Sequence, residues 1–73
     1  MGAKRTTIIP KAPAARILMN AGAKRVSASA VDALVEVLED ITENIARKSA
    51  MIAKHAGRKT IQDGDVKLAS KTM

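Results

Sequence analysis

The chain has 73 residues and a mass of 7.7 kDa, which is enough for one domain but too little for a core that stabilises a lone monomer comfortably. It contains no Cys, Phe, Tyr or Trp and only one His, which excludes disulfides, a zinc site built from four Cys and His ligands, and an aromatic core. A partner subunit is what remains to stabilise the fold, and the formal net charge of +6 predicts a polyanionic ligand.

The first predicted element is a short helix that follows a tail. Residues 1–9 lack a sustained hydrophobic period, so we expect a flexible basic N-terminal tail and then one folded domain over residues 10–73. Pro13 suits the first turn of a helix, because the N–H that proline lacks has no partner there. The apolar residues behind it predict a helix that starts at Pro13, runs for about 8–10 residues and ends before Gly22.

The longest predicted helix spans residues 28–56. Ser27 is a good N-cap, and apolar residues recur at spacings of four and three from Leu34 to Ile52. No Gly or Pro interrupts this pattern before Gly57. Such a helix is about 43 Å long, whereas a compact globule of this chain length is only about 30 Å across. The chain cannot enclose this helix, so the middle of the helix must pack on another chain.

A third short helix is predicted over about residues 62–70, where Val66 and Leu68 supply apolar side chains. Asp63 and Asp65 stand at its amino end, where the helix dipole favours acidic residues. The predicted fold class is therefore all-α, with a short helix, a long central helix and a second short helix.

The charges are separated into blocks along the chain. Residues 1–31 contain basic side chains and no acidic one, and residues 44–62 repeat this pattern. Residues 32–43 contain acidic side chains and no basic one, and residues 63–73 are balanced. A solvated helix surface would intersperse the two signs. Separate blocks instead predict two basic regions that act on one polyanion.

Three kinds of functional motif fail on inspection. Residues 1–6 fit the N-myristoylation pattern, but the pattern is short and one acyl chain anchors only marginally. Residues 57–60 resemble the end of a phosphate-binding P-loop, but Arg58 stands where a glycine must precede the lysine. With His55 as its one imidazole and no thiol, the chain offers no catalytic constellation. We expect no enzyme activity, no cofactor, no metal and no small-molecule substrate.

Several fragments, in order and spacing, resemble the archaeal histones. They are Ala12-Pro13 followed by Arg16-Ile17, then Ala21-Gly22-Ala23-Lys24-Arg25-Val26-Ser27, and then His55-Ala56-Gly57-Arg58-Lys59-Thr60-Ile61 with Asp65 and Leu68-Ala69. The resemblance covers about residues 10–69. It implies the histone fold, in which two chains form an intertwined handshake dimer by crossing their long central helices.

The resemblance also implies a chromatin protein that binds, bends and wraps double-stranded DNA with little sequence specificity. In a handshake dimer the first connector of one chain lies beside the second connector of the other, so that a basic patch forms at each end. Arg16 would enter the minor groove, and Arg58 would pair with Asp65 of its own chain and support the connector. The DNA-binding residues implied in this way are Arg16, Arg25, Lys59, Thr60, Lys24, Ser27, Arg58 and Lys11.

Assembly beyond the dimer follows from the same resemblance. Ile52, His55 and Asp65 match the contact between dimers, in which His55 would hydrogen-bond Asp65 of the neighbouring dimer. Dimers would then extend into a nucleosome-like rod of wrapped DNA. The residues expected between superhelical layers are Gly22, Glu36, Asp40, Lys67 and Lys71.

Two other function classes compete with this hypothesis. A histone-fold subunit of a transcription-factor complex would pair with a different histone-fold chain, but such subunits often lose DNA-contact residues that are present here. An RNA-binding or ribosomal protein would share the high pI but usually supplies aromatic stacking residues, which this chain lacks. The dimer partner is either a second copy or a paralogue. No apolar run is long enough for a membrane span or a signal peptide, so we expect a cytoplasmic protein on the chromosome.

Overall fold

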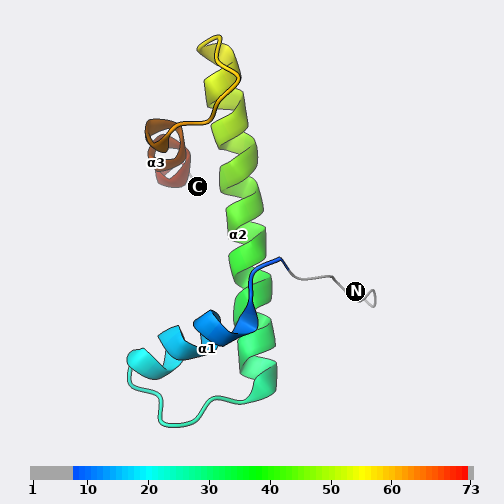
Figure 1. Cartoon of the computed structure of the whole chain (residues 1–73), viewed down its shortest axis with the longest axis vertical. Helices are drawn as coiled ribbons and strands as arrows, with labels where there is room; N and C mark the ends of the chain where they lie inside the picture. Colours follow the sequence, from blue (N-terminus) through cyan, green and yellow to red (C-terminus); the bar gives the residue numbers. More distant parts are fainter. Residues whose placement is uncertain (1–7, 73) are drawn as a thin grey trace. The chain divides into compact units, whose positions relative to one another are not determined.

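The computed structural model describes residues 8–72, which form three helices and, within that range, no strand. They are α1 (Lys11–Asn20), the long α2 (Ala28–His55) and α3 (Asp63–Lys71) (Figure 1). The chain divides into two compact units, Met1–Glu39 and Asp40–Met73, and α2 contributes its first part to one unit and its second part to the other. The predicted short, long and short order of helices is confirmed. Residues 1–7 of the predicted tail lie outside the described residues.

The predicted start of the first helix is wrong by two residues. α1 begins at Lys11, and Pro10 is its N-cap with an extended backbone (φ −67°, ψ 145°). Pro13 lies inside the first turn instead of opening it. The first N–H groups of a helix have no partner within the helix, so a proline at any of these positions costs no hydrogen bond. A proline in the first turn therefore marks the region of the helix start but not its first residue.

Glycines end both helices that precede a connector. After α1, the N–H of Gly22 donates to the carbonyl of Met19 at 3.0 Å, and the N–H of Ala23 donates to the carbonyl of Leu18 at 3.4 Å. This pair of hydrogen bonds is the Schellman motif. It requires one residue with a left-handed backbone conformation, which glycine adopts at the lowest steric cost. Gly22 has φ +119°, and Gly57 with φ +74° ends α2 through the same pair of bonds.

The amino ends of α2 and α3 are capped by side chains. Ser27 accepts a hydrogen bond on Oγ from the N–H of Ala30 at 3.1 Å, as its predicted role of N-cap requires. Gln62 and Asp65 form a reciprocal capping box at the start of α3. These caps explain why α2 begins one residue after Ser27 and why α3 begins one residue after Gln62.

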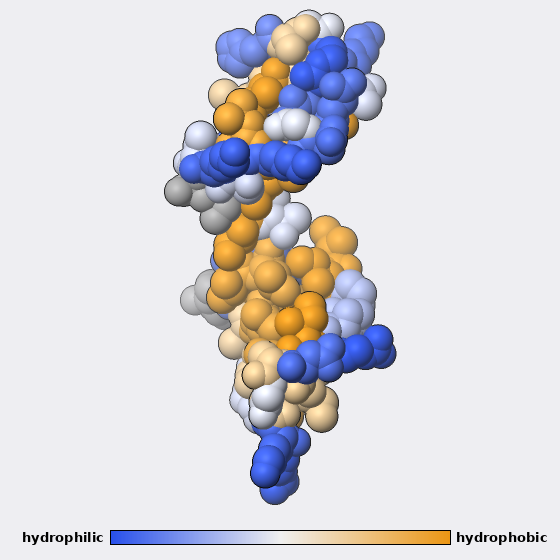
Figure 2. All heavy atoms as spheres, turned by 90° about the vertical axis from the view of Figure 1, so that its left-hand side faces the viewer, coloured by the Kyte–Doolittle hydropathy of each residue, from blue (hydrophilic) through white to orange (hydrophobic). Residues whose placement is uncertain are grey.

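The chain by itself buries few apolar side chains. In the first unit Ala14, Val31 and Val35 form the buried cluster, and partly buried neighbours from α1, α2 and the connector pack against it. In the second unit Ala53 and Ala69 are the buried apolar residues. The predicted stripe of α2 is otherwise only partly buried, and apolar side chains stay exposed along α2 (Figure 2). One chain therefore does not complete its own core.

Substitution in this stripe tests whether a second chain covers it. We expect Leu38→Ala to lower the free energy of unfolding by about 2–5 kcal/mol, the usual loss for a leucine in a core, although Leu38 is only half-buried in the single chain. Met51→Ala, at a side chain that is 59% exposed, is the control and should change stability by about 0.5 kcal/mol or less. Denaturant titrations at several protein concentrations measure both. A midpoint that is independent of concentration, or equal losses for the two variants, would contradict a dimer that buries the stripe.

Candidate nucleic-acid interface

The first connector presents two cations to solvent. Lys24 and Arg25 lie between Gly22 and Ser27, both are exposed, and neither forms an ion pair with any residue in the range 8–72. The connector is fixed at both ends, by the Schellman motif at Gly22 and by the cap at Ser27. Two exposed cationic side chains thus stand on a backbone of defined geometry at the amino end of α2.

The two cations of α1 differ in their surroundings. Arg16 is exposed and has no ion-pair partner among the described residues. Lys11 instead forms an ion pair with Asp32 of α2, with 2.8 Å between Nζ and Oδ1. Both of these side chains are more than half exposed, so the pair is worth little in stability. It does reduce the charge that Lys11 offers to a phosphate.

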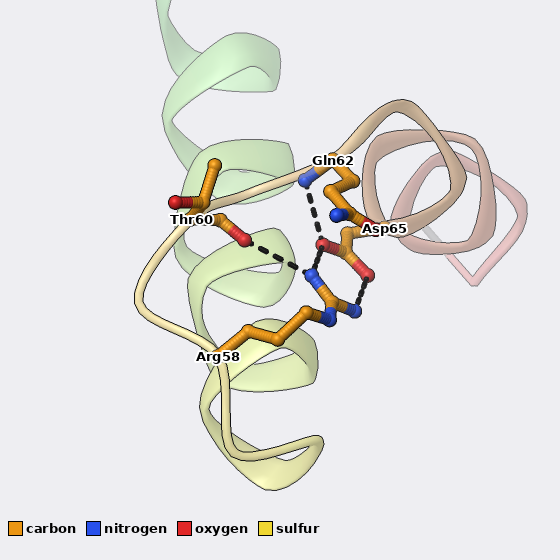
Figure 3. Close-up of polar contacts among 4 residues, drawn as sticks. All are labelled: Arg58, Thr60, Gln62 and Asp65. Atoms are coloured by element: carbon orange, nitrogen blue, oxygen red, sulfur yellow. Dashed lines mark hydrogen bonds and ion pairs between the residues drawn. The ribbon is translucent and has the colours of Figure 1, made fainter.

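The second connector is fixed by Arg58. Its guanidinium donates two parallel hydrogen bonds to the carboxylate of Asp65, each 2.9 Å long, and a third to the carbonyl of Thr60 (Figure 3). Asp65 Oδ2 also accepts the N–H of Gln62 at 2.8 Å. The predicted pairing of Arg58 with Asp65 is present. Arg58 therefore supports the connector, and its neighbour Lys59 remains exposed without an ion-pair partner in the described part of the chain.

We call the hydrogen-bonded pair of Arg58 and Asp65 the clip. Its geometry shifts the pKa values of both side chains. The hydrogen bonds from Arg58, then the one from the Gln62 backbone, lower the pKa of Asp65 to about 2 from an ordinary value of 3.8. Asp65 in turn raises the pKa of Arg58. Asp65 is only 4% exposed and accepts three of the roughly four hydrogen bonds that a carboxylate takes. The clip stays ionised over the whole neutral range.

The residues predicted for assembly are placed as follows. His55 is the last residue of α2 and is exposed, whereas Ile52 one turn earlier is half-buried. Glu36 and Asp40 are exposed on α2, and Lys67 and Lys71 are exposed on α3. Gly22 lies in the connector, where its positive φ already requires glycine, so close approach between layers is not needed to explain this residue.

Other kinds of site find little support in residues 8–72. No group of three or more His, Cys, Asp and Glu side chains in this range is arranged to hold a metal ion. No helix in the same range is long and apolar enough to cross a membrane. The exposed cations of the connectors and of α1 are therefore the candidate binding site, and the ligand that fits them is a polyanion.

The sequence of this chain is similar to those of known proteins. The family described as histone-like transcription factor (CBF/NF-Y) and archaeal histone matches residues 7–69. The chain is 54% identical over 61 residues to "Probable archaeal histone 3" of Methanocaldococcus jannaschii, covering 84% of this chain and 91% of that protein. It is 46% identical over 63 residues to one of the subunits of archaeal histone HAN1 from Thermococcus zilligii, covering 86% and 94% respectively. The chain belongs to this family. The histone fold predicted from the motifs is confirmed, and the handshake dimer is the form expected of the family.

Sequence reasoning missed two contacts of this histone-fold chain. The pairing of Lys11 with Asp32 was not predicted, and Lys11 was assigned to DNA alone. The backbone N–H groups of Ile8 and Ile9 both donate to the carboxylate of Glu39, although residues 1–9 were predicted as tail. No motif signals either contact, because the partners are separated by about twenty to thirty residues and meet only when α1 packs on α2.

The lowered pKa of Asp65 predicts a specific loss of stability in acid. Because the pKa is lower in the folded chain than in the unfolded chain, the clip stabilises the fold above about pH 4 and loses this contribution as the pH falls toward 2. Asp65→Asn should therefore destabilise the protein at pH 7, and the difference from wild type should shrink between pH 4 and pH 2. Exposed Asp63, on the same turn, provides the control Asp63→Asn. Denaturant titrations across this range measure the difference, and a gap between Asp65→Asn and wild type that does not change with pH would contradict the assignment.

Proposed function

We propose that this protein binds, bends and wraps double-stranded DNA with little sequence specificity, as dimers that assemble into nucleosome-like rods on the chromosome, and that it is not an enzyme. Membership of the family supports the coarser statement that it is a DNA-binding chromatin protein. One observation supports the mode of binding. Exposed cations without an ion-pair partner among residues 8–72 include four on α1 and the two connectors, although the chain has seven acidic residues. These four cations are Arg16, Lys24, Arg25 and Lys59.

The cations divide into two roles by chemistry. Arg16 stands on a helix, and a planar guanidinium suits an inward-facing, narrowed minor groove where negative potential is concentrated. Histone octamers insert arginines into the minor groove in this way. Lys24, Arg25 and Lys59 stand on connectors and would neutralise phosphates, which fixes position but carries no sequence information. No helix within residues 8–72 presents Asn or Gln side chains in the manner of a recognition helix, so base-specific contacts are not part of the proposal.

The remaining predicted contacts take supporting roles. Ser27 and Thr60 would add hydroxyl or N–H contacts to phosphates, with Ser27 at the amino end of α2. Arg58 already makes three hydrogen bonds within the chain, so it would hold the second connector in shape for Lys59 and Thr60. Lys11 would contribute less than the unpaired cations, because a phosphate must compete with Asp32.

Salt dependence tests the DNA contacts. The affinity for a short duplex should fall steeply with salt, with a log–log slope of about −0.9 for each phosphate neutralised. Arg25→Ala should reduce the steepness by about 0.9 per chain. Lys67→Ala removes the same charge from an exposed position on α3 and should change the slope much less. Fluorescence anisotropy from low to high salt measures these slopes. A flat titration of the wild type would refute DNA wrapping, and equal effects of the two variants would refute the role of the connector.

Assembly between dimers is proposed at the end of α2. Exposed His55 would donate to Asp65 of the neighbouring dimer, where the Oδ1 atom still has room for one more hydrogen bond, and Ile52 would pack beside it. Between superhelical layers, Glu36 and Asp40 would meet lysines of α3. The lysines are Lys67 and Lys71.

Two variants separate these assembly contacts. His55→Ala should shorten the ladder that micrococcal nuclease produces on random DNA, because fewer dimers join in a row. Glu36→Lys with Asp40→Lys should keep the ladder but lower the sedimentation coefficient of long complexes, because contacts between layers are lost. An unchanged ladder for His55→Ala, or undiminished compaction for the double variant, would show that the corresponding contact is assigned wrongly.

The family name offers a second candidate, a transcription-factor component that pairs with a different histone-fold chain. The partner-free cations on both connectors favour chromatin, because a component that works through protein contacts does not need them. Micrococcal nuclease digestion of random DNA bound by the purified protein distinguishes the two candidates. A chromatin protein protects random DNA in a regular ladder, whereas a transcription-factor component leaves a smear until its partner chain is added.

A further inference from the structure

Two of the cations predicted to contact DNA are held by acids of the same chain, in different ways. Arg58 donates two parallel hydrogen bonds to Asp65, whose side chain is only 5% exposed. Lys11 makes one contact of 2.8 Å to Asp32, and these two side chains are 55% and 56% exposed. Water competes for the groups of an exposed pair and salt screens their attraction. The pair of Lys11 and Asp32 is therefore easily exchanged for another partner, whereas the clip is not.

Opening this pair does not release the start of α1. Glu39 accepts hydrogen bonds on Oε2 from the backbone N–H groups of Ile8 and Ile9, which lie directly before this helix. The side chain of Ile9 also packs against the buried cluster of the first unit. Asp32 and Glu39 stand about two turns apart on α2, so they hold the start of α1 at separate points. The ammonium of Lys11 can thus leave Asp32 while the backbone beside it stays in place.

Lys11 lies close enough to the proposed DNA contact of α1 to bind a phosphate instead. Arg16 stands on the same helix, about 7.5 Å from Lys11 along the helix axis. This distance is below the Debye length of about 10 Å at 0.1 M salt, so a phosphate near Arg16 also attracts Lys11. The first turn of α1 contains no acidic residue. Among residues 8–72, Asp32 is therefore the acid with which a phosphate must compete for Lys11.

We propose that Asp32 lowers the affinity of this protein for DNA, because Lys11 must exchange its ion pair with Asp32 for a contact with a phosphate. This inference rests on the proposed function. The strength of an exposed ion pair corresponds to a factor of about 1.5 to 5 in affinity for each pair. A dimer carries this pair twice. Asp32 then sets the affinity through Lys11 and without a DNA contact of its own.

The exchange is tested directly by NMR of the full-length protein. The carboxyl ¹³C signal of Asp32 responds to a cation bound at the carboxylate, so Lys11→Ala should shift this signal in the free protein. A DNA duplex added to the wild type should shift it in the same direction, because Lys11 leaves Asp32. The duplex should shift it much less in Lys11→Ala. A signal that Lys11→Ala does not move would overturn the pair, and a signal that DNA does not move in the wild type would overturn the exchange.

The effect on affinity is tested by a double-mutant cycle on a duplex that accommodates one dimer. Asp32 also repels phosphates by its own charge, and the cycle separates this repulsion from the exchange. Asp32→Asn should strengthen binding about 1.5- to 5-fold more per chain in the wild type than in Lys11→Ala. Asp32→Glu, which keeps the carboxylate, should bind DNA like the wild type. Fluorescence anisotropy at one fixed salt concentration measures all of these affinities.

Glu36→Gln is the matched control for the cycle. Glu36 is exposed one turn after Asp32 on α2 and has no ion-pair partner among residues 8–72. A single dimer also offers it no second layer to contact. Its neutralisation should therefore strengthen binding by the same factor with and without Lys11.

The outcomes separate this inference from the proposed function. Equal gains from Asp32→Asn with and without Lys11 would overturn the inference while the wild type still binds DNA. A gain from Glu36→Gln that depends on Lys11 as strongly would overturn the assignment to Asp32. A wild type that does not bind the duplex would overturn the proposed function, and the ¹³C signal of the free protein would still report whether the pair forms.

Discussion

The structure depends on one helix that its own chain cannot cover. α2 runs from Ala28 to His55 without interruption, and its apolar stripe faces too little of the rest of the chain to be buried. Because short chains bury a small share of their surface, the remaining apolar area must be covered by a second chain for the fold to be stable. The handshake dimer expected of the family meets this requirement. In such a dimer, folding and assembly are one process.

The same helix separates the charges. Acidic side chains occupy the first half of α2, and in the described structure at least two of them bind groups of the chain itself. Asp32 pairs with Lys11, and Glu39 holds the backbone of Ile8 and Ile9. These acids therefore serve to position α1 and the segment before it. Apart from Arg58, the cations of the connectors have no ion-pair partner among residues 8–72, so the charges of Lys24, Arg25 and Lys59 are available to a polyanion.

Both connectors combine a fixed backbone with exposed cationic side chains. A Schellman glycine begins each one, and a cap on the following helix ends it. The second connector is further held by Arg58 and Asp65, a pair whose lowered carboxylate pKa keeps it ionised down to strongly acidic pH. In the proposed mode of binding, a backbone of defined geometry would reduce the entropy lost when these side chains bind phosphates. Residues that need not touch DNA would then link the stability of the connector to the affinity for DNA.

The sequence by itself determined the order and limits of the helices, because these follow from local signals. Ser27 as N-cap, Gly22 and Gly57 as terminators, and the period of the α2 stripe placed every helix boundary to within about two residues. Its motifs also determined the family and the pairing of Arg58 with Asp65. The tertiary structure alone decided which of the other charges are engaged. Lys11 is partly neutralised by Asp32, and Glu39 draws in two residues predicted as tail, because α1 packs against α2 and brings together groups that no local pattern relates.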